Sequence, residues 1–247
     1  MRSRADRLHG ILNGVDYKAW NPQNDPNLIE PYSKERLQGK AKNNAALQSE
    51  FGLPVDGDIP LMVHAGRLVE QKGADLILKA LEEIPQQTRY QLAIIGSGKT
   101  WLERALKNFA KSRPDSVSIK IGYDEALARR LEAGGDIFLM PSRFEPCGLN
   151  QIYSLKYGTV PIVHRVGGLA DTVVDTIDHT LNAGIATGFV FDHPDPFDLR
   201  VAIQKAIELY QNRKAWRMLM RTGMAQDFSW ATSARQYIKL YRHVIET

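Results

Sequence analysis

The sequence predicts a doubly wound α/β domain, Rossmann-like, with a parallel sheet of about six strands. Two observations predict it: the strand-like runs are short and apolar throughout, and helical segments separate them. A strand that is apolar along its whole length is buried on both faces, and a helix between successive strands forms a right-handed crossover. The expected strands are residues 60–67, 90–95, 117–121, 137–140, 160–163 and 188–191.

A lead-in precedes the first strand. Residues 9–33 carry many turn formers and are expected to be irregular, whereas residues 34–52, rich in Lys, Ala, Gln and Leu and ending at Gly52, are expected to form a helix. We therefore divide the chain into a lead-in segment with its helix, a main domain and a C-terminal helix, over residues 1–58, 59–228 and 229–247.

Helices are expected after the strands. Two have clear capping signals: Asp124 precedes one, and Asp195 followed by Pro196 opens another. The second of these has one apolar face, formed by Leu199, Ala202, Ile203, Ala206, Ile207 and Tyr210. The expected helices are residues 74–84, 99–111, 125–133 and 148–157, the helix opened by Asp195, and residues 214–224 and 230–245.

Composition excludes several classes of protein. The chain has 247 residues, 43% of them hydrophobic, so it is too apolar to be disordered. Its 32 Lys+Arg and 28 Asp+Glu give a net charge of +4 without a dense basic tract, which fits a small anionic ligand and argues against nucleic acid. A single cysteine excludes an intramolecular disulfide and points to a reducing compartment such as the cytoplasm. No apolar run approaches the length of a membrane span, so we expect no membrane partner.

In folds of this type, ligands bind where the carboxyl ends of the strands meet the following loops. The first such loop, Gly66–Gly73, contains Arg67 and Lys72. A guanidinium fork and an ammonium so placed could close on a diphosphate from two sides. The alternative is that both are ordinary surface cations.

The second loop, Gly96–Thr100, partly matches the phosphate-binding loop of ATPases. The first glycine of that pattern falls on Ala93, inside the strand, and the third glycine of the dinucleotide fingerprint falls on Trp101. A tight turn that touches a ligand is therefore the preferred interpretation.

The third loop places Tyr123 after Gly122, where its ring could stack on a base or simply pack. The fifth, with Gly167 and Gly168, is at least as well explained as a tight connection as by a ligand role. The six histidines show no metal-ligand spacing, and no metal site is expected.

The fourth loop, Pro141–Gln151, is the most informative. It sets the carboxylate of Glu145 between a strand and a helix N-terminus, where the backbone amides of Gly148, Leu149 and Asn150 would attract an anion. A group attached to that anion, such as a sugar, would then lie beside the carboxylate. Alternatively, Glu145 pairs with Arg143; Cys147, with no base indicated nearby, is expected to be a small packing residue rather than a nucleophile.

Taken together, these loops resemble a known family. The segments GRLVEQKG, IGY, PSRFEPCGLNQ and RVGGLADTV, with the opening HGILNGVDYKAWNP, closely resemble the C-terminal half of bacterial glycogen synthases and plant starch synthases. The resemblance covers essentially the whole chain. It implies one half of the two-domain GT-B architecture, in a retaining glycosyltransferase that moves glucose from ADP-glucose to the non-reducing end of an α-1,4-glucan.

The resemblance also implies residue roles. Arg67 and Lys72 would bind the phosphates and offset charge on the departing diphosphate, and Tyr123 would lie against the adenine. Amides near Leu149 and Asn150 would hold the distal phosphate, and Glu145 would contact the donor glucose, so Glu145, Arg67 and Lys72 are the expected catalytic residues. No metal or other cofactor is implied. Many related transferases carry a second Glu eight positions after the first, where this sequence has Tyr153.

One departure concerns the other half of the architecture. The family's acceptor domain carries a K-x-G-G-L motif that this sequence lacks, so the expectation is an isolated nucleotide-sugar-binding domain, weakly active or inactive by itself, with the glucan acceptor bound by the missing domain. The last helix, with Tyr237, Ile238, Tyr241, Val244 and Ile245, would pack across the domain boundary in a complete enzyme. A UDP-sugar-dependent enzyme of the same architecture and a non-catalytic nucleotide-sugar-binding module remain alternatives. The expected location is the cytoplasm, or the plastid stroma in a plant.

Overall fold

The computed structural model describes residues 7–246 and contains a six-stranded sheet in which all strand pairs are parallel. The strand order is β3-β2-β1-β4-β5-β6, the order typical of Rossmann folds, so the predicted fold class is confirmed. The strands are β1 Leu61–Ala65, β2 Gln91–Gly96, β3 Val117–Ile121, β4 Ile137–Met140, β5 Val160–His164 and β6 Phe189–Phe191.

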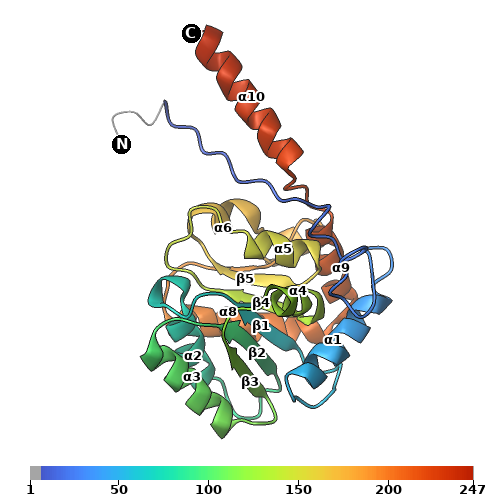
Figure 1. Cartoon of the computed structure of the whole chain (residues 1–247), viewed down its shortest axis with the longest axis vertical. Helices are drawn as coiled ribbons and strands as arrows, with labels where there is room; N and C mark the ends of the chain where they lie inside the picture. Colours follow the sequence, from blue (N-terminus) through green and yellow to red (C-terminus); the bar gives the residue numbers. More distant parts are fainter. Residues whose placement is uncertain (1–6, 247) are drawn as a thin grey trace.

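Alternate residues of the inner strands enter two separate apolar cores, one on each face of the sheet, whereas the apolar residues of the edge strand β3 enter only one of them. In β1, Met62 packs with the core under α2 (Ala74–Glu82), α3 (Thr100–Ser112), α8 (Pro196–Gln211) and α9 (Arg213–Met224). Leu61 and Val63 pack with the core under α1 (Gln38–Glu50) and α4 (Glu125–Gly134). Helices therefore cover both faces (Figure 1). The helices are α1 Gln38–Glu50, α2 Ala74–Glu82, α3 Thr100–Ser112, α4 Glu125–Gly134, α5 Asn150–Lys156, α6 Gly167–Thr172, α7 Asp178–Asn182, α8 Pro196–Gln211, α9 Arg213–Met224 and α10 Trp230–Glu246.

The predicted capping signals are confirmed. The Asp124 side chain accepts a hydrogen bond from the Leu127 amide, and the Asp195 side chain accepts one from the Asp198 amide. All six residues of the predicted apolar face of α8 are buried. Helix α6 follows the connection at Gly167-Gly168, which was expected to join a strand to a helix, whereas the short helix α7 and a 3₁₀ turn at Glu70–Lys72 lie in segments where no helix was expected.

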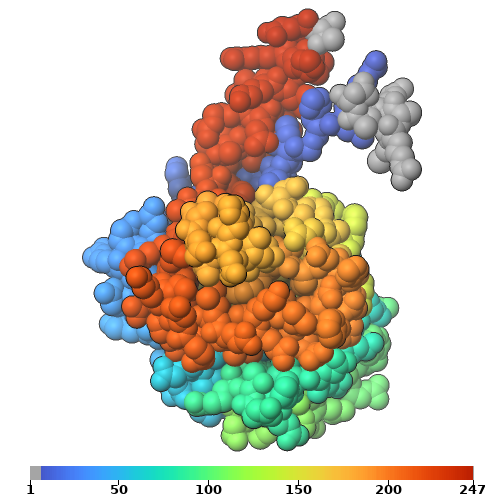
Figure 2. All heavy atoms as spheres, turned by 180° about the vertical axis from the view of Figure 1, so that it is seen from behind, coloured from blue at the N-terminus to red at the C-terminus, as the bar shows by residue number. Residues whose placement is uncertain are grey.

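Two segments leave the body of the molecule. Helix α10 and the N-terminal part of the chain project from it together (Figures 1 and 2), and Ser233 of α10 donates a hydrogen bond to the Leu12 carbonyl at 2.8 Å. Ser233 is the buried residue of α10. The apolar face predicted for this helix, formed by Tyr237, Ile238, Tyr241, Val244 and Ile245, is exposed. Within residues 7–246, no helix combines the length and the apolarity that a membrane crossing requires.

Candidate functional site

The loops that follow β1 and β4 lie against each other at the carboxyl edge of the sheet. The Arg143 amide donates to the Gln71 carbonyl at 2.9 Å, which ties the backbones together. Gly73, at φ 73°, makes the approach possible, because a Cβ there would lie 2.1 Å from the Pro141 carbonyl oxygen. Two loops distant in the sequence thus form one continuous rim.

Lys72 and Glu145 form an ion pair across this rim. The Glu145 carboxylate is 9% exposed and the Lys72 side chain 23%, so water screens the pair only in part. Ser142 donates a hydroxyl hydrogen bond to the same carboxylate oxygen at 3.2 Å. An ammonium has three N–H donors, and one of them serves Glu145, so two remain for a ligand.

Arg67 lies on the same rim and is exposed. Its guanidinium donates to the Gln71 side chain at 3.4 Å, and Gln71 in turn donates to the Phe144 carbonyl at 3.3 Å, next to Glu145. The structure therefore brings the three predicted catalytic residues together on one edge of the sheet, with Gln71 between Arg67 and the loop of Glu145.

A cavity of about 440 Å³ opens beside Arg67, at the carboxyl ends of β1, β2 and β3. Asn150 lines it and donates its side-chain amide to the Ala65 carbonyl at 2.9 Å. Gly122, at φ 140°, and Tyr123, 84% exposed, line its far side. Among the predicted binding residues, Lys72, Glu145, Gly148 and Leu149 lie outside the lining of this cavity.

The segment between Glu145 and α5 has the form expected of an anion site. Gly148 has φ 73°, Leu149 is the N-cap, and α5 begins at Asn150, two residues later than predicted. Within residues 7–246, the backbone amides of these three residues donate to no protein acceptor. They are thus available to a ligand beside the Lys72–Glu145 pair.

The Gly-Gly turn at the start of α6 supports this segment from behind. The Gly168 amide donates to the Glu145 carbonyl at 3.1 Å, and a Cβ at Gly168 would lie 2.1 Å from the Cys147 carbonyl oxygen. A Cβ at Gly167, which has φ 46°, would lie 2.2 Å from the Glu145 carbonyl oxygen, so the tight-connection interpretation accounts for both glycines.

The structure does not support two alternative interpretations of the loops: an ion pair between Arg143 and Glu145, and a phosphate-binding role for the second loop. Arg143 pairs with Asp75, at 2.7 and 2.8 Å, and not with Glu145. In the second loop, the Gly98 amide donates to the Glu103 carboxylate at 2.8 Å, so it is not directed at a phosphate.

Sequence reasoning assigned no site role to two aromatic residues of the cavity, Trp20 and Tyr153, although Tyr153 was noted at the position of the second Glu of related transferases. Their rings are stacked, with centroids 3.7 Å apart and planes 7° apart. Tyr153 follows Asn150 by one helical turn, a spacing that could have marked it as a wall residue. Nothing local in the irregular lead-in could have marked Trp20.

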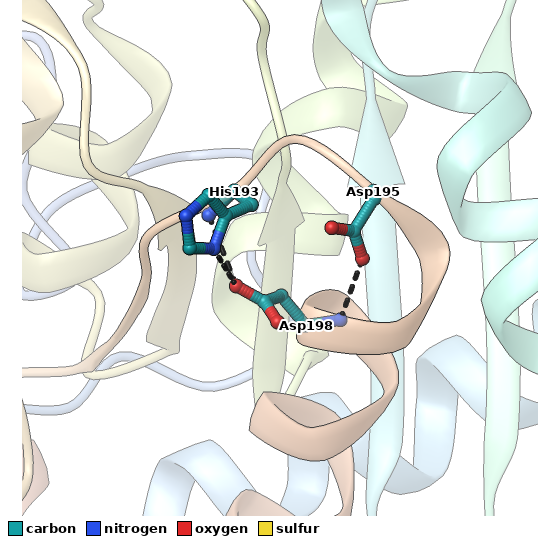
Figure 3. A group of neighbouring side chains, drawn as sticks. All are labelled: His193, Asp195 and Asp198. Atoms are coloured by element: carbon teal, nitrogen blue, oxygen red, sulfur yellow. Dashed lines mark hydrogen bonds and ion pairs between the residues drawn. The ribbon is translucent and has the colours of Figure 1, made fainter.

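His193, Asp195 and Asp198 form a second polar cluster, with ligand-type atoms within 4.8 Å of one another (Figure 3). The spacing analysis of the histidines did not mark it. Asp195 caps α8, and Asp198 accepts hydrogen bonds from the His193 amide at 3.0 Å and from its Nδ1 at 2.9 Å. The hydrogen bond of the His193 ring to the Asp198 carboxylate, together with the charge of that carboxylate, raises the pKa of His193 above its usual value. Capping of the helix accounts for the arrangement.

A larger cavity, about 860 Å³, lies between α1 and α9. Asp136, which precedes β4, and Gly57, which precedes β1, line it, so it opens at the amino ends of the strands. None of the predicted site residues lines it. The chemistry described above belongs to the smaller cavity because that cavity lies on the edge where the loops converge.

A family model described as "Glycosyl transferases group 1" matches residues 48–219, which include β1 to β6 and the whole rim. The chain belongs to this family. We therefore interpret the arrangement of Arg67, Lys72 and Glu145 as part of a group 1 glycosyltransferase.

Within group 1, two relatives with curated names are glycogen synthases. A glycogen synthase of Thioalkalivibrio sulfidiphilus is 51% identical over 245 residues, which are 99% of this chain and 51% of that protein. Glycogen synthase 1 of Methylococcus capsulatus is 49% identical and matched to 99% of this chain and 50% of its own length. The chain spans about half the length of the curated relatives it matches.

Among solved structures, the catalytic domain of starch synthase IV from Arabidopsis thaliana, bound to ADP and acarbose, superposes with a TM-score of 0.90 at 35% identity. It covers 100% of this chain and 51% of the starch synthase chain. The C-terminal domain of a group 1 glycosyltransferase from Francisella tularensis shares the fold, with a TM-score of 0.60 at 14% identity. Both of these structures therefore contain a domain with the fold of this chain, as the sequence predicts for one half of the GT-B architecture.

Proposed function

We propose that this chain is the donor-binding half of a retaining glucosyltransferase that transfers glucose from ADP-glucose to the non-reducing end of an α-1,4-glucan. The observation that carries the proposal is the Lys72–Glu145 ion pair on the same rim as Arg67. It sets two cationic groups beside one carboxylate, next to a cavity with an aromatic residue, Tyr123, at its far side. The named glycogen synthases and the ADP-bound starch synthase support this choice of reaction and donor.

The chemistry follows from the charges. When the bond between the glucose C1 and the diphosphate oxygen breaks, its electron pair stays with ADP, and positive charge develops on the sugar. Arg67, Lys72 and the backbone amides of residues 148–150 would stabilise the diphosphate, and the Glu145 carboxylate would lie near the electron-poor sugar. Since these groups offset the leaving-group charge themselves, we propose that the reaction needs no metal ion.

The acceptor glucan would bind to a second domain of the GT-B architecture, across the cleft from this rim. We expect the chain alone to bind ADP and to extend glucan little or not at all. We also propose a cytoplasmic location.

Calorimetric titration of the chain with ADP tests the proposal. Lys72→Ala and Arg67→Ala should each weaken ADP binding at least tenfold, since a hydrogen bond to a charged group contributes about 1.5–3 kcal/mol. Lys205→Ala, an exposed lysine on α8, is the matched control and should bind ADP as the wild type does. Unchanged affinity in both rim variants would remove them from the site.

Two further titrations address the nucleotide and the metal. ADP should bind more tightly than UDP; the reverse order would favour a UDP-sugar donor. ADP affinity should be the same in EDTA and in magnesium. Dependence on magnesium would contradict the metal-free proposal.

A further inference from the structure

The cavity of about 860 Å³ between α1 and α9 has no part in the proposed function (Figure 1). It opens at the amino ends of the strands, where Gly57 and Asp136 line it, whereas the rim lies at their carboxyl ends. Helix α1 contributes two small side chains to its wall, Ala41 and Ala45, so the space between the helices is not filled. A cavity of this volume is large enough for a ring-sized molecule with a charged group attached.

Helix α9 forms the wall with the most distinctive chemistry. Trp216 and Met220, four residues apart, are both buried and form an apolar floor. Beside them, at the same spacing, Arg213, Arg217 and Arg221 form a cationic edge. Successive arginines of this edge are about 6 Å apart along the helix axis. The cavity therefore presents an apolar floor next to a row of guanidinium groups.

Two of these α9 side chains have hydrogen-bond donors without acceptors. The indole Nε1 of Trp216 is buried and bonds to no atom of the described chain. The guanidinium of Arg217, the next residue, is exposed and has no ion pair or hydrogen bond within residues 7–246. Buried indole N–H groups normally have an acceptor, so the exception at Trp216 indicates that a ligand supplies one.

The carboxylates that line the cavity, by contrast, already have donors. The cavity thus has donors to spare and needs acceptor atoms. Four lysines and arginines against three carboxylates in its lining favour a ligand that is negatively charged. The three carboxylates, Asp136, Asp58 and Glu35, accept hydrogen bonds from the Leu61 amide at 2.9 Å, the Arg213 guanidinium at 3.1 Å and the Ser33 hydroxyl at 2.8 Å.

The cationic edge indicates which charged group the ligand carries. Arg217 lies one helical turn from Arg213 and from Arg221. These two neighbours donate to backbone carbonyls, of Gly57 at 2.8 Å and of Lys34 at 3.0 Å, which anchors them and leaves each with further N–H groups. Guanidinium groups bind phosphate through two parallel hydrogen bonds, and a phosphate monoester has three terminal oxygens, enough for Arg217 and a neighbour together.

We propose that the cavity between α1 and α9 binds a phosphate monoester with a ring-sized body, its phosphate on Arg217 and its body over Trp216 and Met220. This second site is separate from the rim, so both can be occupied at once. The proposal does not rest on the proposed function, because none of its residues takes part in nucleotide binding.

The test follows the indole Nε1–H resonance of Trp216 by NMR while the chain is titrated with phenyl phosphate. This resonance should shift as the probe binds. Trp20, which lines the 440 Å³ cavity, reports binding there and should not shift with it. The Trp216 shift should be the same with and without saturating ADP. No shift at millimolar phenyl phosphate, or a shift that ADP abolishes, would overturn the proposal; a chain that binds no ADP would overturn only the proposed function.

Arg217→Gln tests the phosphate contact. The side chain is exposed, so the fold should be unaffected, and loss of its charged hydrogen bonds should weaken phenyl phosphate binding about tenfold in calorimetry. Lys214→Gln is the matched control: it removes one positive charge from the exposed surface of the same helix, outside the lining of the cavity. It should bind the probe as the wild type does, and equal affinities of the two variants would contradict a specific contact at Arg217.

Two further probes separate the head of the ligand from its body. Inorganic phosphate lacks the ring that covers the apolar floor, and benzoate has one terminal oxygen fewer, so each should bind about fivefold more weakly than phenyl phosphate. Inorganic phosphate that binds as tightly as phenyl phosphate would show that no ring-sized body is recognised. Benzoate that binds as tightly would show that the site does not select phosphate.

Discussion

Arg143 and Asp75 form a bidentate ion pair, at 2.7 and 2.8 Å, that joins the loop after β4 to the first turn of α2. This pair holds the Pro141–Asn150 segment, and with it Glu145, against the loop that carries Lys72. The pairing raises the pKa of Arg143, so the guanidinium remains charged at all pH values at which the protein is folded. The geometry of the rim therefore depends on a contact outside the cavity.

Asp75→Asn should lower the free energy of unfolding by about 1 kcal/mol, because the pair is partly exposed, and should weaken ADP binding severalfold. Urea denaturation and calorimetry measure the two effects. Glu50→Gln is the matched control: Glu50 makes a similar bidentate pair with Arg130, at 2.8 and 2.8 Å, between α1 and α4. It should cost comparable stability and leave ADP binding unchanged. Equal loss of ADP affinity in both variants would contradict a specific role of the Arg143–Asp75 pair.

The Glu145→Gln variant should show how the charge of this carboxylate, as distinct from the position of the side chain, affects ADP binding. The amide keeps the shape but no longer neutralises Lys72 or repels a diphosphate, so ADP should bind about twofold to threefold more tightly than to the wild type. The gain should shrink at high salt, since screening weakens charge interactions at a partly exposed site. Calorimetry at two salt concentrations measures both effects, and weaker ADP binding would show that Glu145 orders Lys72 rather than competing with the phosphates.

The sheet was predictable because its inner strands are largely apolar, and strand boundaries could be read to within a few residues; the edge strand β3 also carries Ser118 and Lys120. Strands β3 and β4 begin and end where the sequence indicated. The capped helices α4 and α8 were predictable for a local reason, since Asp124 and Asp195 mark their first turns. The rim was predictable because loops after parallel strands converge at one edge, which brings Lys72 to Glu145.

Other features depend on contacts between distant segments. The Trp20–Tyr153 stack joins the irregular lead-in to α5, and no periodicity signals it. Helix α7 is too short for helical periodicity to be visible in the sequence, so it was not expected. From the sequence, Glu145 was considered as the ion-pair partner of Arg143 because it lies two positions away. The partner in the structure, Asp75, lies on α2, which is distant in the sequence.

Gly73→Ala should open the rim. The residue has φ 73°, and a Cβ there would lie 2.1 Å from the Pro141 carbonyl oxygen, so the two loops must separate. Backbone strain of about 1–2 kcal/mol adds to about 1–3 kcal/mol for overpacking. Gly52→Ala is the matched control, with φ 68° and no atom within 4 Å of the added Cβ. It should show only the strain, with ADP binding intact. Equal destabilisation of the two variants, measured by urea denaturation, would contradict a close packing of the loops.

Lys40 should make the stability of the fold rise with pH above neutrality. Its ammonium is buried, donating to the Ala133 carbonyl at 3.0 Å and to the Thr159 hydroxyl at 2.8 Å, and burial lowers its pKa to about 8. In the unfolded chain a lysine has a pKa of about 10.4. Between pH 8 and about 9.5 the unfolded state therefore binds more protons than the folded state, and this group adds a positive slope of at most ~1.4 kcal/mol per pH unit to the free energy of unfolding.

The measurement is urea denaturation of the wild type and Lys40→Met from pH 7 to 9.5. Above that range, buried tyrosines such as Tyr157 act in the opposite direction, because burial raises their pKa in the folded state. The wild type should gain stability relative to Lys40→Met as pH rises, whereas Lys205→Met, which removes an exposed lysine, should follow the wild type at every pH. An NMR titration of the Lys40 ε-carbon provides a direct readout that does not depend on the variant folding. A midpoint near 10.4, or parallel stability curves for wild type and Lys40→Met, would show that the ammonium is solvated and that its burial does not control this slope.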